Sequence, residues 1–134
     1  MLTEQTSVVI VESQPVMRTV LTTILSSEGM TVLAALANSS DALQVASTLT
    51  PNLILFSVND LNLQDLNRIV ALRSEVSSAR IIALITGEFH GQFQTVLDHG
   101  AHLVLTKSTQ RSDLLHAIKN VAHKGIYPAS MQVN

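Results

Sequence analysis

The sequence contains no cysteine, so disulfide bonds and thiolate metal sites are excluded. Charge is also scarce: 13% of the 134 residues are charged, and the eight Lys and Arg residues are scattered rather than clustered. A surface that binds nucleic acid needs clustered basic side chains, so we expect no nucleic-acid binding by this chain alone. With a net charge of −2, copies of the chain repel one another weakly, which favours self-association.

A long hydrophobic run is missing as well. The amino terminus, MLTEQTS, is polar, and no apolar run approaches the ~20 residues that a transmembrane helix requires. These features predict a chain that does not enter a membrane and lies in the cytoplasm. No GxGxxG, GxxxxGK(S/T) or GxSxG pattern occurs, so neither a nucleotide site nor a hydrolase is indicated. We expect no enzyme activity and no cofactor.

What the sequence does have is a regular alternation of short apolar runs with segments of helical periodicity. Five such units with short connections predict an α/β domain with helices on both faces of a parallel sheet. The expected fold is the flavodoxin-like (βα)5 doubly wound sheet with strand order 2-1-3-4-5. We assign residues 1–125 to this domain and residues 126–134 to the start of a linker or tail. The predicted strands cover residues 7–11, 30–36, 53–57, 80–85 and 102–106, and the third and last helices residues 65–76 and 110–124.

Open α/β sheets bind ligands at the carboxyl ends of their strands, at the point where the strand order reverses. In the predicted order this point lies between the first and third strands. The third strand is apolar until it ends on a hydroxyl, at Ser57. A carboxylate, hydroxyls and an ammonium group at one rim would suit a phosphoryl site. The candidate site residues at this rim are Glu12, Ser13, Ser57, Asn59, Thr86 and Lys107.

Several motifs in register resemble the receiver domain of bacterial two-component response regulators, over the whole chain. ESQPVMR, residues 12–18, is similar to that family's acidic pair followed by a helix, with a proline typical of the NarL/FixJ (LuxR-type) class. LILFSVNDLNLQDL resembles its phosphoacceptor strand and loop. Thr86 matches the switch threonine, and Lys107, followed by serine, matches the family's lysine. The ending LLHAIKNVAHKGIYPASM resembles the close of NarL-type receivers, where a linker to a helix-turn-helix domain begins.

The departures from the family pattern concern its chemistry. Ser57 stands where the resemblance places the aspartate that takes the phosphoryl group, and Ser13 stands where it places a direct magnesium ligand. Only Glu12 keeps a carboxylate. Mg²⁺ requires hard oxygen ligands and is usually anchored by one or two carboxylates together with phosphate. Val104 stands at the position of the switch aromatic. The resemblance with these departures predicts a pseudo-receiver that neither accepts a phosphoryl group nor binds a metal.

Structural roles are expected for several of these side chains. Ser57 could be a site of serine phosphorylation, but no general base is evident beside it in the sequence, so a structural role is favoured. Lys107 is expected to pair with Glu12, and Asp60 to be a solvated loop carboxylate. The histidine pairs 99/102 and 116/123 have no third ligand, so surface histidines are expected rather than a metal site.

Three functions remain open from the sequence. The first is the regulatory domain of a LuxR-type transcription factor that works without aspartate phosphorylation. It would act as a homodimer or by binding a protein partner or small molecule, with DNA bound by a further C-terminal domain. The second is a stand-alone adaptor for another signalling protein, and the third an enzyme that uses the Glu12–Ser57 rim. Two dimer faces remain open: the first and last helices, or the fourth helix together with the fifth strand and the last helix. Both include the last helix, and we expect His116, Lys119 and Asn120 on its outer side.

Overall fold

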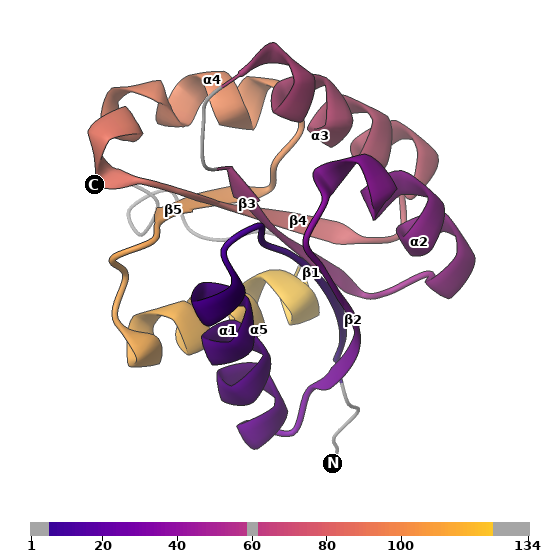
Figure 1. Cartoon of the computed structure of the whole chain (residues 1–134), viewed down its shortest axis with the longest axis vertical. Helices are drawn as coiled ribbons and strands as arrows, with labels where there is room; N and C mark the ends of the chain where they lie inside the picture. Colours follow the sequence, from indigo (N-terminus) through magenta and orange to yellow (C-terminus); the bar gives the residue numbers. More distant parts are fainter. Residues whose placement is uncertain (1–5, 59–61, 125–134) are drawn as a thin grey trace.

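The computed structural model describes residues 6–58 and 62–124, which form a five-stranded parallel sheet between two layers of helices (Figure 1). The strand order β2-β1-β3-β4-β5 confirms the predicted flavodoxin-like fold. The strands are β1 (Ser7–Val11), β2 (Thr31–Leu36), β3 (Leu53–Val58), β4 (Arg80–Ile85) and β5 (Leu103–Thr106). The helices are α1 (Pro15–Ser27), α2 (Ala42–Leu49), α3 (Leu63–Glu75), α4 (Phe93–Asp98) and α5 (Arg111–Lys124), with 3-10 turns η1 (Ser39–Asp41) and η2 (Gly87–Gln92).

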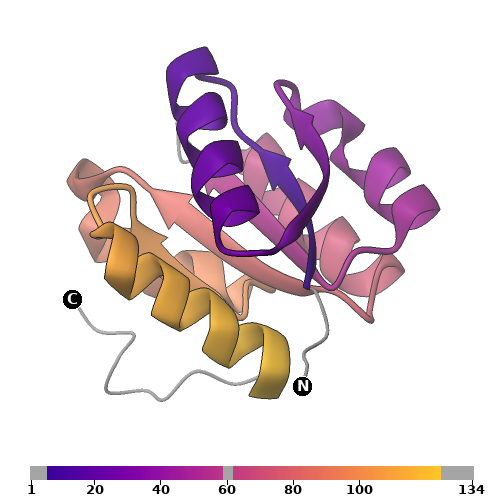
Figure 2. The ribbon, with the colours of Figure 1, turned by 90° about the horizontal axis from the view of Figure 1, so that it is seen from below.

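The position of β3 at the centre of the sheet explains why its sequence is apolar at nearly every position. All six of its residues are buried, because helices cover both faces of the sheet (Figure 2). Successive side chains of a strand point to opposite faces. Leu53 and Leu55 therefore pack in the cluster that contains α1 and α5. Ile54, Phe56 and Val58 pack in the cluster beneath α2, α3 and α4.

Some boundaries differ from the sequence prediction. Helix α3 begins at Leu63, two residues earlier than predicted, because the Asn62 side chain accepts a hydrogen bond of 2.8 Å from the Asp65 N–H and caps the helix. Strand β3 continues one residue beyond Ser57, and the turn η1 precedes α2. The predicted linker at residues 126–134 lies outside the described residues. Within the described ranges, no helix has the length and apolarity that crossing a membrane requires.

The paired histidines were predicted to lie on the surface; His116 is exposed, but His99 is partly buried, and so is His102. This residue precedes β5, and its ring is partly buried, with Nδ1 accepting a 2.9 Å hydrogen bond from the Ile81 N–H. Burial lowers the pKa of His102, the positive charges of Arg73 and Arg80 act in the same direction, and together they bring it to about 4. The neutral ring therefore supports the junction of β4 and β5.

This arrangement makes stability depend on pH in a mildly acidic window. The folded-state pKa of His102 is about 4 and the ordinary value is 6.5, so the unfolded chain binds the extra proton as the pH falls below 7. We expect the free energy of unfolding to fall by about 1–2 kcal/mol between pH 7 and pH 5, after allowance for the partial exposure of the ring. Urea unfolding at several pH values measures this.

The variant His102→Asn keeps an acceptor for the Ile81 N–H and removes the titrating group, so its unfolding free energy should change less over the same window. His116→Asn on the exposed side of α5 is the matched control, because it leaves His102 in place. An unchanged pH dependence in His102→Asn would contradict the assignment.

Candidate functional site

Glu12 occupies the centre of the rim at the carboxyl ends of the strands. It follows β1 directly, and its side chain is completely buried. Its Oε1 accepts a 3.2 Å hydrogen bond from Lys107 Nζ, and its Oε2 accepts one of 2.9 Å from the Gln14 N–H. Lys107 follows β5, and its own N–H donates to the Ile85 carbonyl at 2.8 Å. The ion pair predicted between Glu12 and Lys107 is therefore present.

The electrostatic surroundings keep Glu12 ionised. Burial acts to raise the pKa of the Glu12 carboxyl, since it disfavours the charged form. The Ser57 hydroxyl, the Gln14 N–H and the Lys107 ammonium act in the opposite direction, and the net result is a pKa below the ordinary value. At neutral pH the rim thus holds a buried carboxylate whose charge is balanced by one ammonium group.

Ser57 lies beside this pair near the end of β3. Only 5% of the residue is exposed, and within residues 6–58 and 62–124 its Oγ and Thr86 Oγ1 are the buried side-chain polar atoms that make no hydrogen bond. Ser57 Oγ is near enough to Glu12 to lower the pKa of that carboxyl, but its geometry falls short of a hydrogen bond. A buried hydroxyl without a partner costs about 1–3 kcal/mol, so a ligand that reached Ser57 Oγ would be stabilised by supplying one.

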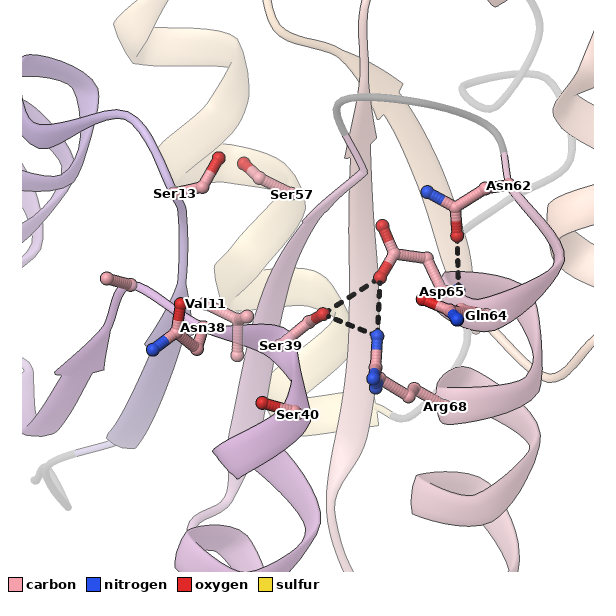
Figure 3. Close-up of a pocket in the computed structure, with 11 residues that line it drawn as sticks. Val11, Ser13, Asn38, Ser39, Ser40, Ser57, Asn62, Gln64, Asp65 and Arg68 are labelled. Atoms are coloured by element: carbon pink, nitrogen blue, oxygen red, sulfur yellow. Dashed lines mark hydrogen bonds and ion pairs between the residues drawn. The ribbon is translucent and has the colours of Figure 1, made fainter.

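A pocket of about 290 Å³ opens next to Ser57, between the connections that follow β1, β2 and β3 (Figure 3). On its far side, Ser39 Oγ donates to Asp65 Oδ1 at 2.9 Å and accepts from Arg68 Nη1 at 2.9 Å. Arg68 and Asp65 also form an ion pair at 3.5 Å. The pocket is lined by Val11, Ser13, Ala37, Asn38, Ser39, Ser40, Ser57, Asn62, Gln64, Asp65 and Arg68.

The structure brings most of the predicted site residues to one rim. Glu12 and Lys107 are paired, Ser57 lies close to Glu12, and Ser13 and Ser57 line the same pocket. Thr86 follows β4, with its hydroxyl buried. Asn59 and Asp60 lie outside the described residues. Val104, at the position of the expected aromatic, is 1% exposed and packs in the core cluster beneath α3 and α4.

Sequence reasoning missed the side of the pocket formed by η1 and α3. The predicted strand order places the connections after β2 and β3 on either side of β1, and this was the signal that could have indicated that side of the pocket. Arg68 was not considered at all, since nothing in its local pattern connects it with Ser39, 29 residues earlier. In the part of the chain that the structure describes, no group of three or more His, Asp or Glu side chains could hold a metal ion.

Comparison with known families decides the class of this chain. The family described as "Response regulator receiver domain" matches residues 8–119, which is most of the sequence. The chain belongs to this family. The resemblance that the motifs indicated is thereby confirmed at the level of the family.

Among curated proteins, this receiver domain is 27% identical over 120 residues to the nitrate/nitrite response regulator protein NarL of Escherichia coli K12, covering 89% of this chain and 56% of that protein. It is 30% identical over 128 residues to NarP of the same organism, covering 95% of this chain and 59% of that protein. The receiver domain thus spans less than three fifths of the length of these relatives.

Among solved structures, the signal receiver domain of a NarL response regulator from Mycobacterium tuberculosis is similar with a TM-score of 0.81 and 20% identity, covering 91% of this chain and 99% of that chain. The isolated receiver domain of RcsB from Salmonella enterica serovar Typhimurium is similar with a TM-score of 0.81 and 16% identity, covering 98% of this chain and all of that chain. At these identities the likeness concerns the fold.

Proposed function

We propose that this receiver domain transmits a signal without aspartyl phosphorylation, as the regulatory part of a LuxR-type DNA-binding transcription regulator. The observation that carries the proposal is Ser57, which stands near the buried end of β3 where the family pattern has its phosphoacceptor. The similarity to NarL and NarP, both response regulators longer than this chain, supports the placement in a longer regulator. Reading the coding sequence beyond Asn134 for a helix-turn-helix tests that placement.

The chemistry of the rim supports a loss of phosphoryl transfer. A serine hydroxyl cannot form an acyl phosphate, and Ser13 and Ser57 together remove two carboxylates from the place where Mg²⁺ would bind. The remaining carboxylate, Glu12, already accepts hydrogen bonds from Lys107 and from the backbone. Lys107 is thus paired within the domain, in the absence of any phosphoryl group.

Incubation with acetyl phosphate and Mg²⁺ should therefore leave the intact mass of the domain unchanged. The measurement is mass spectrometry before and after treatment with base, because an acyl phosphate is lost in base more readily than a serine phosphate monoester. An added phosphoryl group that disappears in base would overturn the proposal.

The surface formed by α1 and α5 supports a second part of the proposal, self-association without a phosphoryl signal. Val16 and Val20 of α1 are 77% and 42% exposed. Val20 borders an apolar groove of about 160 Å³ between the two helices, which Ile24 and Leu114 also line. The low net charge of −2 adds little repulsion between copies. A second copy of the domain would cover these side chains.

Lys119 was placed on the outer side of α5 from the sequence, and it is exposed there. Its Nζ, however, lies 3.6 Å from Glu28 Oε1 within the same chain. Lys119→Glu would therefore set two carboxylates against each other inside the domain, and a substitution on α1 tests the interface more directly.

Sedimentation equilibrium should show a concentration-dependent dimer of the untreated domain. Val16→Glu should weaken dimerisation by about tenfold or more, because it places a charge in an apolar contact. Val70→Glu is the matched control, since Val70 is 45% exposed on α3, on the other face of the sheet. A domain that stays monomeric at high micromolar concentration would exclude the dimer, and an equal effect of both variants would place the interface elsewhere.

A further inference from the structure

We propose that the pocket beside Ser57 binds a small, uncharged, polyhydroxylated molecule of the polyol or monosaccharide class. The inference rests on the proposed function, because the hydroxyl of Ser57 must not carry a phosphoryl group. The pocket lies at the point of the sheet where open α/β folds bind ligands, and its volume of about 290 Å³ is just below the ~300–1,000 Å³ range of ligand pockets, which suits a small ligand.

The charges in the pocket favour a neutral ligand. Asp65 and Arg68 are the charged side chains of its lining, and they are paired with each other at 3.5 Å. An anion that approached Arg68 would meet the carboxylate of Asp65, and a cation that approached Asp65 would meet the guanidinium. Behind Ser57, the buried pair of Glu12 and Lys107 is likewise balanced. Neither sign of charge is attracted overall.

The polar lining matches hydroxyl groups. Nine of the eleven lining residues are polar, and apart from Asp65 and Arg68 they are serines, asparagines and a glutamine. Serine hydroxyls and side-chain amides both donate and accept hydrogen bonds, as the hydroxyl groups of a polyol do. A site of this kind suits a neutral ligand that returns both types of bond, whereas inorganic phosphate carries a negative charge that the balanced lining does not neutralise.

Two features of the pocket are arranged before any ligand arrives. Ser39 is fixed in place by its hydrogen bonds to Asp65 and Arg68, at 2.9 Å each. At the other end, the Ser57 hydroxyl lies near that of Ser13 (Figure 3) and has no hydrogen-bond partner among the described residues, although the residue is 95% buried. A ligand hydroxyl placed there would give the Ser57 oxygen the partner that the fold leaves out.

The test is a titration of the ¹⁵N-labelled domain with glycerol, myo-inositol and glucose as neutral probes, and with inorganic phosphate as the charged probe. At least one neutral probe should bind with a Kd in the millimolar range or below and shift the amide signals of Ser13, Ser40 and Ser57. Inorganic phosphate should bind at least about tenfold more weakly. Absence of binding by every neutral probe at about 50 mM, well above the expected millimolar Kd, would overturn the proposal.

Variants separate this pocket from non-specific binding. Ser57→Ala removes the hydroxyl that has no partner and should leave the fold intact. It should weaken the binding of the neutral probe by about tenfold. Gln64→Ala, at an exposed lining position, is a second variant with the same expected direction. Gln94→Ala on α4 is the control outside the pocket. Affinity that is the same in all three variants would refute the site.

A failure of the ligand site is distinguishable from a failure of the proposed function. A base-labile phosphoryl group gained from acetyl phosphate would overturn the proposed function, whatever the titrations show. If acetyl phosphate adds no base-labile phosphoryl group and no neutral probe binds, the ligand site alone is overturned.

Discussion

Replacing Lys107 with methionine should destabilise the domain by about 3–5 kcal/mol at pH 7. The substitution leaves the Glu12 carboxylate, which is fully buried, without the ammonium group that lies 3.2 Å from it. The remaining hydrogen bond from the Gln14 N–H is not enough to replace a full opposite charge. The pKa of Glu12 should rise above its ordinary value as a result, and urea unfolding at pH 7 measures the loss of stability.

Two further measurements separate this mechanism from a loss of packing. In Lys107→Met the folded-state pKa of Glu12 lies above the unfolded one, so the defect should shrink as the pH falls and Glu12 takes up a proton. The double variant Glu12→Gln with Lys107→Met should recover most of the loss, because it removes both charges. A loss below about 1 kcal/mol in the single variant would mean that the pair behaves as a surface salt bridge.

Replacing Ser57 with aspartate should also destabilise the domain, by about 2–3 kcal/mol at pH 7 without Mg²⁺, because it buries an additional charge. The new carboxylate would stand beside Glu12 at a position that is 5% exposed, and two neighbouring carboxylates with one ammonium cannot both be balanced. Ser57→Asn, which has the same shape without the charge, is the control and should lose less.

Magnesium should rescue only the double variant. Ser13→Asp together with Ser57→Asp restores both carboxylates that the family pattern places at this rim, so Mg²⁺ should bind and raise the free energy of unfolding. The gain is about 2.7 kcal/mol when free Mg²⁺ is about 100 times its Kd. Urea unfolding with and without Mg²⁺ measures the gain in both variants. Ser57→Asp alone binding Mg²⁺ as tightly as the double variant would refute the role given to Ser13.

The sequence was sufficient to predict the sheet because its signals are local. Each strand is a short, mostly apolar run, and the apolar residues 53–56 of β3 follow from burial on both faces. The ion pair of Glu12 with Lys107 was predictable because both residues follow strands whose carboxyl ends share one edge. Strand order and strand ends together were therefore enough to name the centre of the site.

The pocket could not be predicted in the same way. Its far wall depends on Ser39 meeting Asp65 and Arg68 across a gap of 26 and 29 residues, and on side-chain rotamers that no periodicity specifies. The partly buried His102 was missed for the same reason, because its partner, the Ile81 N–H, belongs to a neighbouring strand 21 residues away. Contacts between side chains of different connections appear only when the backbone is placed.

The Glu12–Lys107 pair also has a consequence for the rates of folding and unfolding. It joins two residues 95 positions apart, and β3 and β4 lie between the strands that carry them. Closing so long a loop is slow and entropically costly, so the pair should form only after the middle of the sheet has assembled. An interaction that forms after the transition state slows unfolding and hardly changes the folding rate. The pair would thus act chiefly on the lifetime of the folded domain.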